Sequence, residues 1–423
     1  MRGSGSRSIR GDSPNGGFLP ATIGWTCFAA ITRRLLTTHA DRSSFFIALV
    51  VVDVLAGLAD AMSGPYLVLF LVDQARLSPL LLSAVLTARA VAGIAFATGL
   101  GGWVDRRTSV APLLLALAGS SIGYALLGFT TDFALLLVIA ALPVAIGAAV
   151  FSQSIALVRR GFEHASFHTA SRALGVLRAS WSLAWAIGPA IGAVVVGAFG
   201  FRGVFFTSAA SSAVALATLA LVRARPVSGD AGHENRSKPL NGGPAITLAF
   251  TALALFHTAM FLGSIPLAIV LTTSLGGVKS DVGLAYSLCA ALEIVVMGAL
   301  IWRPLKRAER PAIVAGFAVF VAYFVALALA QSVGAVLWAQ ILRAIGIALV
   351  TYLGISFLHS LMPHRAGAAA ALFSNAGQLG SVFAALSAGL LAQAFGYASI
   401  FVVCAILSAV GLVMVCLTPA APE

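Results

Sequence analysis

Long apolar runs recur along almost the whole chain, and they constrain its fold more than any other feature. After residue 44, apolar segments of about 20 residues follow one another, the length at which a helix crosses a bilayer. Hydrophobic residues make up 60% of the chain and charged residues 9%, whereas a soluble domain carries about a quarter charged residues. Because so few charges cannot cover a water-exposed surface, we expect the apolar surplus to face lipid.

Lipid also restricts the secondary structure. Backbone groups in hydrocarbon must form their hydrogen bonds within a helix or a closed barrel. Barrel strands alternate apolar and polar residues, but the runs here are continuous, which favours helices. We therefore expect an all-α membrane protein with twelve transmembrane helices, and not an enzyme. The predicted helices lie at residues 45–73, 80–104, 109–129, 133–158, 169–199, 201–222, 245–274, 281–302, 311–330, 333–361, 366–394 and 396–417.

One long polar break, at residues 224–244, divides the predicted helices into two sets of six. The sets share short patterns: residues 198–201 (Ala-Phe-Gly-Phe) recur as 394–397 (Ala-Phe-Gly-Tyr), and Pro65 has a counterpart in Pro266. Repeated halves are typical of secondary transporters, although chance similarity between Ala-, Gly- and Phe-rich helices is the alternative. We expect two six-helix pseudo-repeats, arranged as a basic, disordered cytoplasmic tail (1–44), a first half (45–223), a cytoplasmic linker (224–244) and a second half (245–423).

The net charge of +12 does not indicate a nucleic-acid partner, because the basic residues form no patch. They form short clusters between the apolar runs, as the positive-inside rule predicts for a membrane protein. With the N-terminus inside, the segments on the cytoplasmic side carry 20 Lys and Arg residues, and those on the outer side carry 3. This bias predicts that both termini are cytoplasmic.

Several motifs of other membrane and metal proteins do not occur in the sequence. There is no GxxxxGK[ST] loop, so we expect no ATP-driven motor within the chain, and there is no TVGYG-type channel filter. The four cysteines form no CxxC pair and are interpreted as small buried side chains, so neither a metal nor a cofactor is expected. Transport would then be driven by an ion gradient, the substrate gradient or a partner.

Six ionisable side chains lie within the predicted spans, three acids and three arginines. Such groups are costly in a membrane, so each needs a partner, water or a function. Matching depths along the helices suggest three pairs, and fixed ion pairs that tie helices together are the alternative to proton exchange. The suggested pairs are Asp53 with Arg178, Asp60 with Arg89, and Glu293 with Arg343, and the candidates for proton coupling are Glu293, Asp60 and Asp53.

Aromatic and amide side chains supply further candidates for binding a substrate. Trp181 and Trp185 follow Arg178 at i+3 and i+7, so the three share one helix face. Such a group can hold a sugar by hydrogen bonds and ring stacking, although a packed interior stripe is an equally good interpretation. Buried amides need partners, which a hydroxyl-rich substrate or a neighbouring helix would supply. The candidate substrate-binding residues are Arg178, Trp181, Trp185, Gln340, Arg343, Asn375 and Gln378.

Two short motifs resemble those of a known family. Residues 101–107 (Gly-Gly-Trp-Val-Asp-Arg-Arg) look like the G-x-x-x-D-R signature of the major facilitator superfamily, which gates the cytoplasmic side. Residues 188–192 begin with Gly-Pro and end with Gly, and they resemble the antiporter-type G-P-x-x-G element near the external gate. The resemblance implies gating roles for Gly101, Asp105, Arg106, Gly188 and Pro189.

Within this superfamily, the likeness is greatest to the bacterial sugar efflux transporters. It rests mainly on residues 177–179 (Leu-Arg-Ala), 182–189 (Ser-Leu-Ala-Trp-Ala-Ile-Gly-Pro) and 291–294 (Ala-Leu-Glu-Ile). The polar and aromatic residues at matching positions are Arg178, Trp185, Glu293, Gln340 and Asn375, whereas Asp53, Asp60, Arg89 and Arg343 are not part of the likeness.

The resemblance implies the major facilitator fold and proton-linked efflux of sugars or related small molecules by alternating access. It also implies a sugar-like substrate, protons and the lipid bilayer as partners, a monomer, and a place in the bacterial inner membrane. A multidrug exporter of lipophilic compounds is one alternative. A membrane receptor or scaffold that transports nothing is another.

The charge bias makes a direct prediction about topology. A cysteine placed at Gly232, in the central polar break, is expected to resist a membrane-impermeant maleimide in intact cells, because this segment lies inside. The same cysteine should react after lysis, and Val278→Cys, in a predicted outer loop, is the positive control. Labelling at position 232 before lysis would contradict the predicted orientation.

Overall fold

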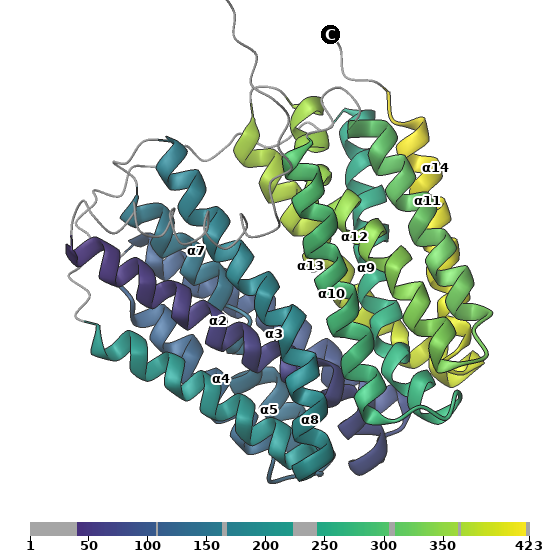
Figure 1. Cartoon of the computed structure of the whole chain (residues 1–423), viewed down its shortest axis with the longest axis horizontal. Coiled ribbons are helices and arrows are strands. Elements are labelled where there is room, and N and C mark those ends of the chain that lie inside the picture. Colours follow the sequence, from purple (N-terminus) through teal and green to yellow (C-terminus); the bar gives the residue numbers. More distant parts are fainter. Residues whose placement is uncertain are drawn as a thin grey trace, which may run out of the picture. The chain divides into compact units, whose positions relative to one another are not determined.

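The chain is described by a computed structural model over residues 40–106, 109–162, 167–222, 243–303, 309–362 and 365–419. Each predicted apolar segment forms helix there, with bounds that differ from the prediction by a few residues (Figure 1). In chain order the helices are α2 (Ala40–Leu69), its π-helical extension η1 (Phe70–Gln74), α3 (Pro79–Arg106), α4 (Ala111–Leu127), α5 (Phe133–Ile139), η2 (Ala140–Val144), α6 (Ala145–Gly147), α7 (Val150–Gly161), α8 (Phe167–Leu221), α9 (Pro244–Thr273), α10 (Lys279–Trp302), α11 (Glu309–Ala328), α12 (Val333–Leu361), α13 (Ala366–Phe395) and α14 (Ser399–Leu417).

The long helix α8 breaks at Gly200, where the backbone has φ 67° and ψ −169°. Only glycine adopts this region without strain, so α8 consists of two helices that meet at the predicted boundary. Gly396, which ends α13, has φ 81° and ψ 164°. These are the two glycines of the repeated Ala-Phe-Gly pattern, and the pattern has the same conformational effect at both places.

By length and composition, ten helices within the described ranges can cross a membrane. That count takes the two parts of α8 as one candidate and leaves out α4, which has 17 residues. The elements α5, η2, α6 and α7 form a single candidate, and its π-helical turn contains Pro143. The fold is therefore all-helical and has the character of a multi-pass membrane protein.

The chain divides into two units, Met1–Ile47 and Ala48–Glu423. Of the first unit, the structure describes residues 40–47, which form the start of α2. Most of the predicted tail (1–44) and nearly all of the predicted linker (224–244) lie outside the described residues. The contacts that build the candidate site all lie within the second unit.

Small side chains join the helices of the first group, which comprises α2 from Ala48 onward and α3 to α8. The hydroxyls of Ser120 and Ser212 lie 3.3 Å apart, and the Ser211 hydroxyl donates to the Leu55 carbonyl oxygen at 2.7 Å. A Cβ atom at Gly123 would lie 2.7 Å from a backbone nitrogen of η2. Close approach at small residues and interhelical hydrogen bonds are how membrane helices associate, because lipid supplies no hydrophobic drive between them.

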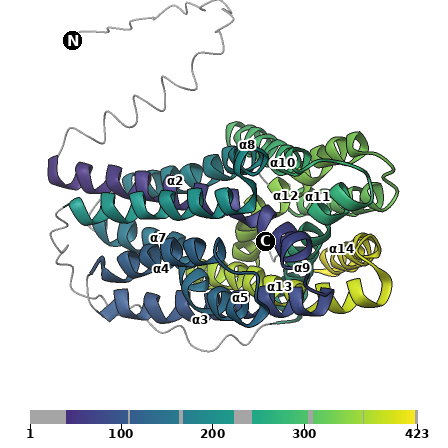
Figure 2. The ribbon, with the colours of Figure 1, turned by 90° about the horizontal axis from the view of Figure 1, so that it is seen from below.

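Helix α9 lies at the centre of the second group, which comprises α9 to α14. It packs against α10, α12, α13 and α14 (Figure 2). The ring centroid of Phe256 on α9 lies 4.5 Å from that of Phe320 and 5.4 Å from that of Phe317, both on α11. Each such aromatic pair contributes about 0.5–1.5 kcal/mol beyond its buried area. An aromatic core therefore fixes α9 within this group.

The two groups touch where α8 meets α10 and where α3 meets α13. Both contacts lie at the same end of the helices, which we call the Gly200 end. At this end the chain turns at residues 75–78, at Gly200, at 274–278 and at Gly396. The candidate site lies between this end and the middle of the helices.

Candidate functional site

One ion pair suggested by matching depth is present near the middle of α2 and α3. Arg89 Nη2 lies 2.9 Å from Asp60 Oδ1, and the Tyr124 hydroxyl donates to the same oxygen at 3.2 Å. The side chains of Arg89 and Asp60 are 28% and 30% exposed. Because hydrocarbon cannot solvate an ion pair at this depth, its exposed part has to face water or a ligand.

Asp53 is completely buried between α2 and α8. The Ser180 hydroxyl lies 3.2 Å from Asp53 Oδ2, while Oδ1 has no hydrogen-bond partner among the described residues. The suggested pair of Asp53 with Arg178 does not form, and Arg178 is exposed. Ser180 is two positions after Arg178, a rotation of about 200° around the helix, so equal depth did not mean the same face.

The two tryptophans predicted to accompany Arg178 lie against α2. Trp181 Cε3 would be 3.3 Å from a Cβ atom at Gly57, and Trp185 Cη2 would be 3.6 Å from one at Gly64. Arg178, on the same helix, is exposed. The structure thus brings the two indole rings to α2, where glycines make room for them, and leaves the guanidinium outside that contact.

Arg343 is buried in the second group with uncharged partners. Its Nη2 donates to Ser264 Oγ at 2.7 Å and its Nη1 to Gln340 Oε1 at 3.4 Å. Its guanidinium carbon lies 5.1 Å from the centre of the Tyr286 ring. The suggested ion pair with Glu293 does not form, although both side chains are described and they interact through space. Two N–H groups of the guanidinium donate to neutral acceptors instead.

The predicted amide ligands have different surroundings. Gln340 is fully buried, and its Nε2 donates to the Val336 carbonyl oxygen at 3.0 Å while its Oε1 accepts from Arg343. Asn375 is exposed and Gln378 is half-buried, both on α13. Asn375 and Gln378 are therefore accessible to a ligand, whereas Gln340 already has protein partners.

The predicted gating element at residues 188–192 packs closely on α2. A Cβ atom at Gly188 would lie 2.6 Å from Ala61 Cβ, and one at Gly192 would lie 2.7 Å from the Tyr66 ring. Pro189 is buried, and its carbonyl oxygen accepts a hydrogen bond from the Tyr66 hydroxyl at 3.3 Å. The glycines allow the two helices to approach to this distance because they have no side chain.

Tyr66 also joins the two groups of helices. Besides the Pro189 carbonyl oxygen, its hydroxyl reaches the Lys279 carbonyl oxygen of α10 at 3.2 Å. Gly283 of α10 faces the same point. A Cβ atom there would clash with the Pro189 carbonyl oxygen and would lie 2.7 Å from both Tyr66 Oη and Ala193 Cβ. No side chain fits at position 283 while α8 and α10 are in contact.

Ser83 of α3 makes the second connection between the groups. Its hydroxyl bonds to the Ala385 carbonyl oxygen of α13 and accepts from the Gly389 N–H at 3.1 Å. A Cβ atom at Gly389 would clash with the Pro79 carbonyl oxygen. Both connections therefore combine a hydroxyl, a glycine and backbone groups.

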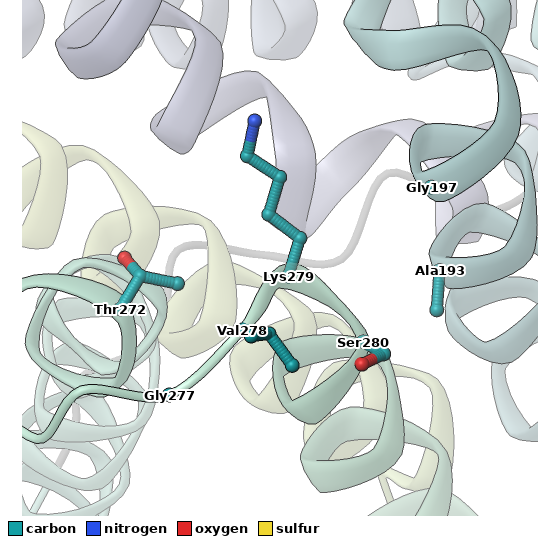
Figure 3. Close-up of a pocket in the computed structure, with 7 residues that line it drawn as sticks. All are labelled: Ala193, Gly197, Thr272, Gly277, Val278, Lys279 and Ser280. Atoms are coloured by element: carbon teal, nitrogen blue, oxygen red, sulfur yellow. The ribbon is translucent and has the colours of Figure 1, made fainter.

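A pocket of about 410 Å³ lies beside the α8–α10 contact (Figure 3). The Lys279 ammonium lies 4.1 Å from the centre of the Phe201 ring, a cation–π contact that links the turn before α10 to the second part of α8. The pocket thus belongs to the Gly200 end, next to the point where the two groups close. Its lining residues are Ala193, Gly197, Thr272, Gly277, Val278, Lys279 and Ser280.

Three glycines near the opposite ends of α3, α8 and α10 have different surroundings among the described residues. A Cβ atom at Gly101 of α3, Gly175 of α8 or Gly298 of α10 would meet no atom within 4 Å. Asp105 and Arg106, the other gating candidates, lie in the last turn of α3, and their side chains are outside the described residues. These three glycine positions therefore make no close contact among the described residues, in contrast to Gly283 and Gly389 at the Gly200 end.

Two residues of the site were not identified from the sequence. His257 is buried in α9, with Nδ1 2.8 Å from the Leu253 carbonyl oxygen, and α13 packs on it at Gly380. An ionisable ring inside a predicted span was the signal, and it was available for His257 as it was for the acids and arginines. Tyr66 carried no comparable signal, because its importance comes from the two carbonyl oxygens that converge on its hydroxyl.

Comparison with known proteins adds a family and close relatives. The family described as Major Facilitator Superfamily matches residues 49–307 and, in a second match, residues 248–423. A Deinococcus radiodurans protein with the provisional name sugar efflux transporter is 34% identical over 368 residues, which cover 86% of this chain and 95% of the relative. Escherichia coli sugar efflux transporter A is 26% identical over 382 residues, which cover 89% and 97%.

Solved structures share the fold. A bacterial homologue of the human lysosomal transporter Spinster, in an inward-facing and occupied conformation, aligns with a TM-score of 0.74 at 14% sequence identity. The alignment covers 90% of this chain and 97% of that chain.

The fit at Gly283 predicts a conformational effect of substitution. Gly283→Leu is expected to separate α8 from α10 at the Gly200 end, because no side chain fits there. A cysteine at the buried Ser287, in a background without the native cysteines, should then react faster with a maleimide. Gly298→Leu, on the same helix but in free space, is the matched control. Equal labelling rates in the two variants would show that the contact does not depend on position 283.

Proposed function

This chain belongs to the major facilitator superfamily, and on that premise we propose that it is a secondary active transporter for proton-linked efflux of sugars or related small molecules. The names of the relatives in Deinococcus radiodurans and Escherichia coli support the substrate class. The observation that carries the proposal is the position of the ionisable side chains. They lie at mid-helix, away from the end where the two groups of helices touch, and Asp60 and Arg89 form a partly exposed ion pair there.

The proposed topology has twelve crossings, in which α4 and the two parts of α8 count separately. Six crossings belong to a first half, residues 45–223, and six to a second half, residues 245–423, and the linker between them is cytoplasmic. The second family match, to residues 248–423, supports this division. The Lys and Arg bias favours cytoplasmic termini in the bacterial inner membrane, with the Gly200 end outside. The transporter acts as a monomer.

In this orientation the described conformation is inward-facing. The contacts of Tyr66 and Ser83 join the two groups at the outer end, whereas Gly101, Gly175 and Gly298, toward the inner end, meet no described atom within 4 Å. Alternating access requires the outer contacts to part while the inner ends approach, which gives a gating role to the segment that contains Gly101, Asp105 and Arg106 and to the Gly188-Pro189 element.

Substrate binding is assigned to polar and aromatic residues of both halves. In the first half the indoles lie against α2, and in the second half exposed or half-buried amides lie on α13. Arg343 and Gln340 are hydrogen-bonded to each other and are buried, and we assign them to the inner wall of the site. The proposed substrate-binding residues are Arg178, Trp181, Trp185, Gln340, Arg343, Asn375 and Gln378.

Glu293 is the first candidate for proton coupling, ahead of Asp60 and Asp53. It lies on α10 and interacts electrostatically with Arg343 of α12, but the two side chains do not form an ion pair. A proton can therefore bind or leave without a salt bridge being broken first. Because α10 also forms the outer contact at Gly283, opening of that contact would change the distance between Glu293 and Arg343 and so link proton exchange to movement.

Counterflow in proteoliposomes tests the function. Vesicles loaded with unlabelled sugar, and diluted into labelled glucose, galactose or maltose, should accumulate label transiently. An imposed proton gradient should drive uptake or release in the absence of counter-substrate. A protein that exchanges lipophilic cations but no sugar is a multidrug exporter, and one that exchanges nothing is not a transporter. Either result would overturn the proposal.

The Glu293→Gln variant distinguishes a role in proton coupling from a structural role in holding helices together. The amide keeps the size and some hydrogen bonding of the carboxyl but cannot titrate, so we expect the variant to retain counterflow and lose accumulation driven by a proton gradient. Glu309→Gln, the same change in the first turn of α11, should behave like the unmodified protein. Normal proton-driven accumulation by Glu293→Gln would remove this residue from the coupling mechanism.

A further inference from the structure

The Asp60–Arg89 pair has hydrogen-bonding groups that the protein does not use. Asp60 Oδ1 accepts from both Arg89 and Tyr124, but Oδ2 has no partner among the described residues. Arg89 uses one nitrogen in this contact, whereas a guanidinium has five N–H donors. Both side chains are about 30% exposed at mid-helix, so the pair is not sealed inside a brace between α2 and α3.

The pair lies at a defined depth below the contacts that close the Gly200 end. Tyr66 is six residues beyond Asp60 on α2, and Arg89 is six residues beyond Ser83 on α3. Each separation is about 9 Å at 1.5 Å per residue. Because both closing contacts lie the same distance from the pair, Asp60 and Arg89 lie directly beneath the closed end.

Aromatic rings flank the pair on α2. Gly57 and Gly64 are three residues before and four residues after Asp60, and residues at these spacings are neighbours on a helix. Trp181 packs at the first glycine and Trp185 at the second. A sugar presents hydroxyls at its rim and apolar C–H groups on its faces. Binding sites for such molecules combine a few fixed polar groups with aromatic walls, which is the arrangement around Asp60.

We propose that Asp60 and Arg89 bind adjacent hydroxyls of a neutral sugar. Asp60 Oδ2 accepts a hydrogen bond from one hydroxyl, and a free N–H of Arg89 donates to the oxygen of the next. The pair carries no net charge, so an uncharged polyol meets no repulsion, whereas a sugar acid would place its carboxylate near that of Asp60. This inference rests on the proposed function and names the substrate class of the site.

Counterflow at equal pH on both sides tests the assignment, because no proton gradient takes part. The variants are Asp60→Asn and Arg89→Lys, and the matched controls are Asp73→Asn and Arg76→Lys, the same changes at exposed positions between α2 and α3. We expect each site variant to raise the KM for labelled glucose or maltose about tenfold, which corresponds to roughly 1.4 kcal/mol of lost binding. The controls should leave KM unchanged, and labelled glucuronate should not exchange.

Three outcomes overturn the inference. An unchanged KM in both site variants, with only the maximal rate or the melting temperature lowered, identifies the pair as a brace. Asp60→Asn that keeps its KM but loses proton-driven uptake makes Asp60 a coupling residue. Exchange of glucuronate as fast as glucose shows that the site does not select neutral sugars. If Asp60→Asn does not fold, the KM of Arg89→Lys alone tests the inference. This variant keeps the positive charge but loses the planar fork of N–H donors. If the unmodified protein exchanges no sugar at all, the proposed function fails as well.

Discussion

The cost of an ionisable side chain in hydrocarbon governs the interior of this protein. Three sets of charged groups within the helices are stabilised in different ways. Asp60 and Arg89 neutralise each other, and Asp53 is enclosed beside the Ser180 hydroxyl. Arg343 spreads its charge over neutral acceptors on α9 and α12. Every one of these solutions joins two helices, so the groups available for ligand or proton chemistry also hold the packing in register.

Closure at the Gly200 end depends on backbone contact rather than on charge. Gly283 and Gly389 let carbonyl oxygens of the other group approach to distances that any side chain would prevent. The hydroxyls of Tyr66 and Ser83 then bond to backbone groups across the contact. The alternating access that we propose requires these contacts to part and reform as α8 and α10, or α3 and α13, tilt relative to each other.

Much of the fold was predictable from the sequence, because lipid allows few alternatives. Apolar run length predicted the helix bounds to within a few residues, and the predicted boundary between residues 199 and 201 coincides with the break at Gly200. The site was less predictable. Depth along a helix paired Asp60 with Arg89 correctly, but it failed for Asp53 with Arg178, which point in different directions around their helices. Depth is a one-dimensional quantity, and a contact also requires the right face and the right neighbouring helix.

The two groups of helices suit different tasks. Asp60 Oδ1 already accepts hydrogen bonds from Arg89 and Tyr124, and its unused Oδ2 suits the proposed contact with a neutral ligand. Glu293 makes no such bonds among the described residues, which suits the role in proton exchange that we propose for it.

Two helices connect these tasks to the closing contacts. Helix α3 carries both Ser83 at the contact with α13 and Arg89 in the ion pair. Helix α10 carries both Gly283 at the contact with α8 and Glu293 near Arg343. In the mechanism that we propose, opening of the Gly200 end moves α3 and α10, and each takes one chemical group with it. The proposed substrate site in the first group and the proposed proton site in the second would then be linked through the same two contacts, without a direct bond between them.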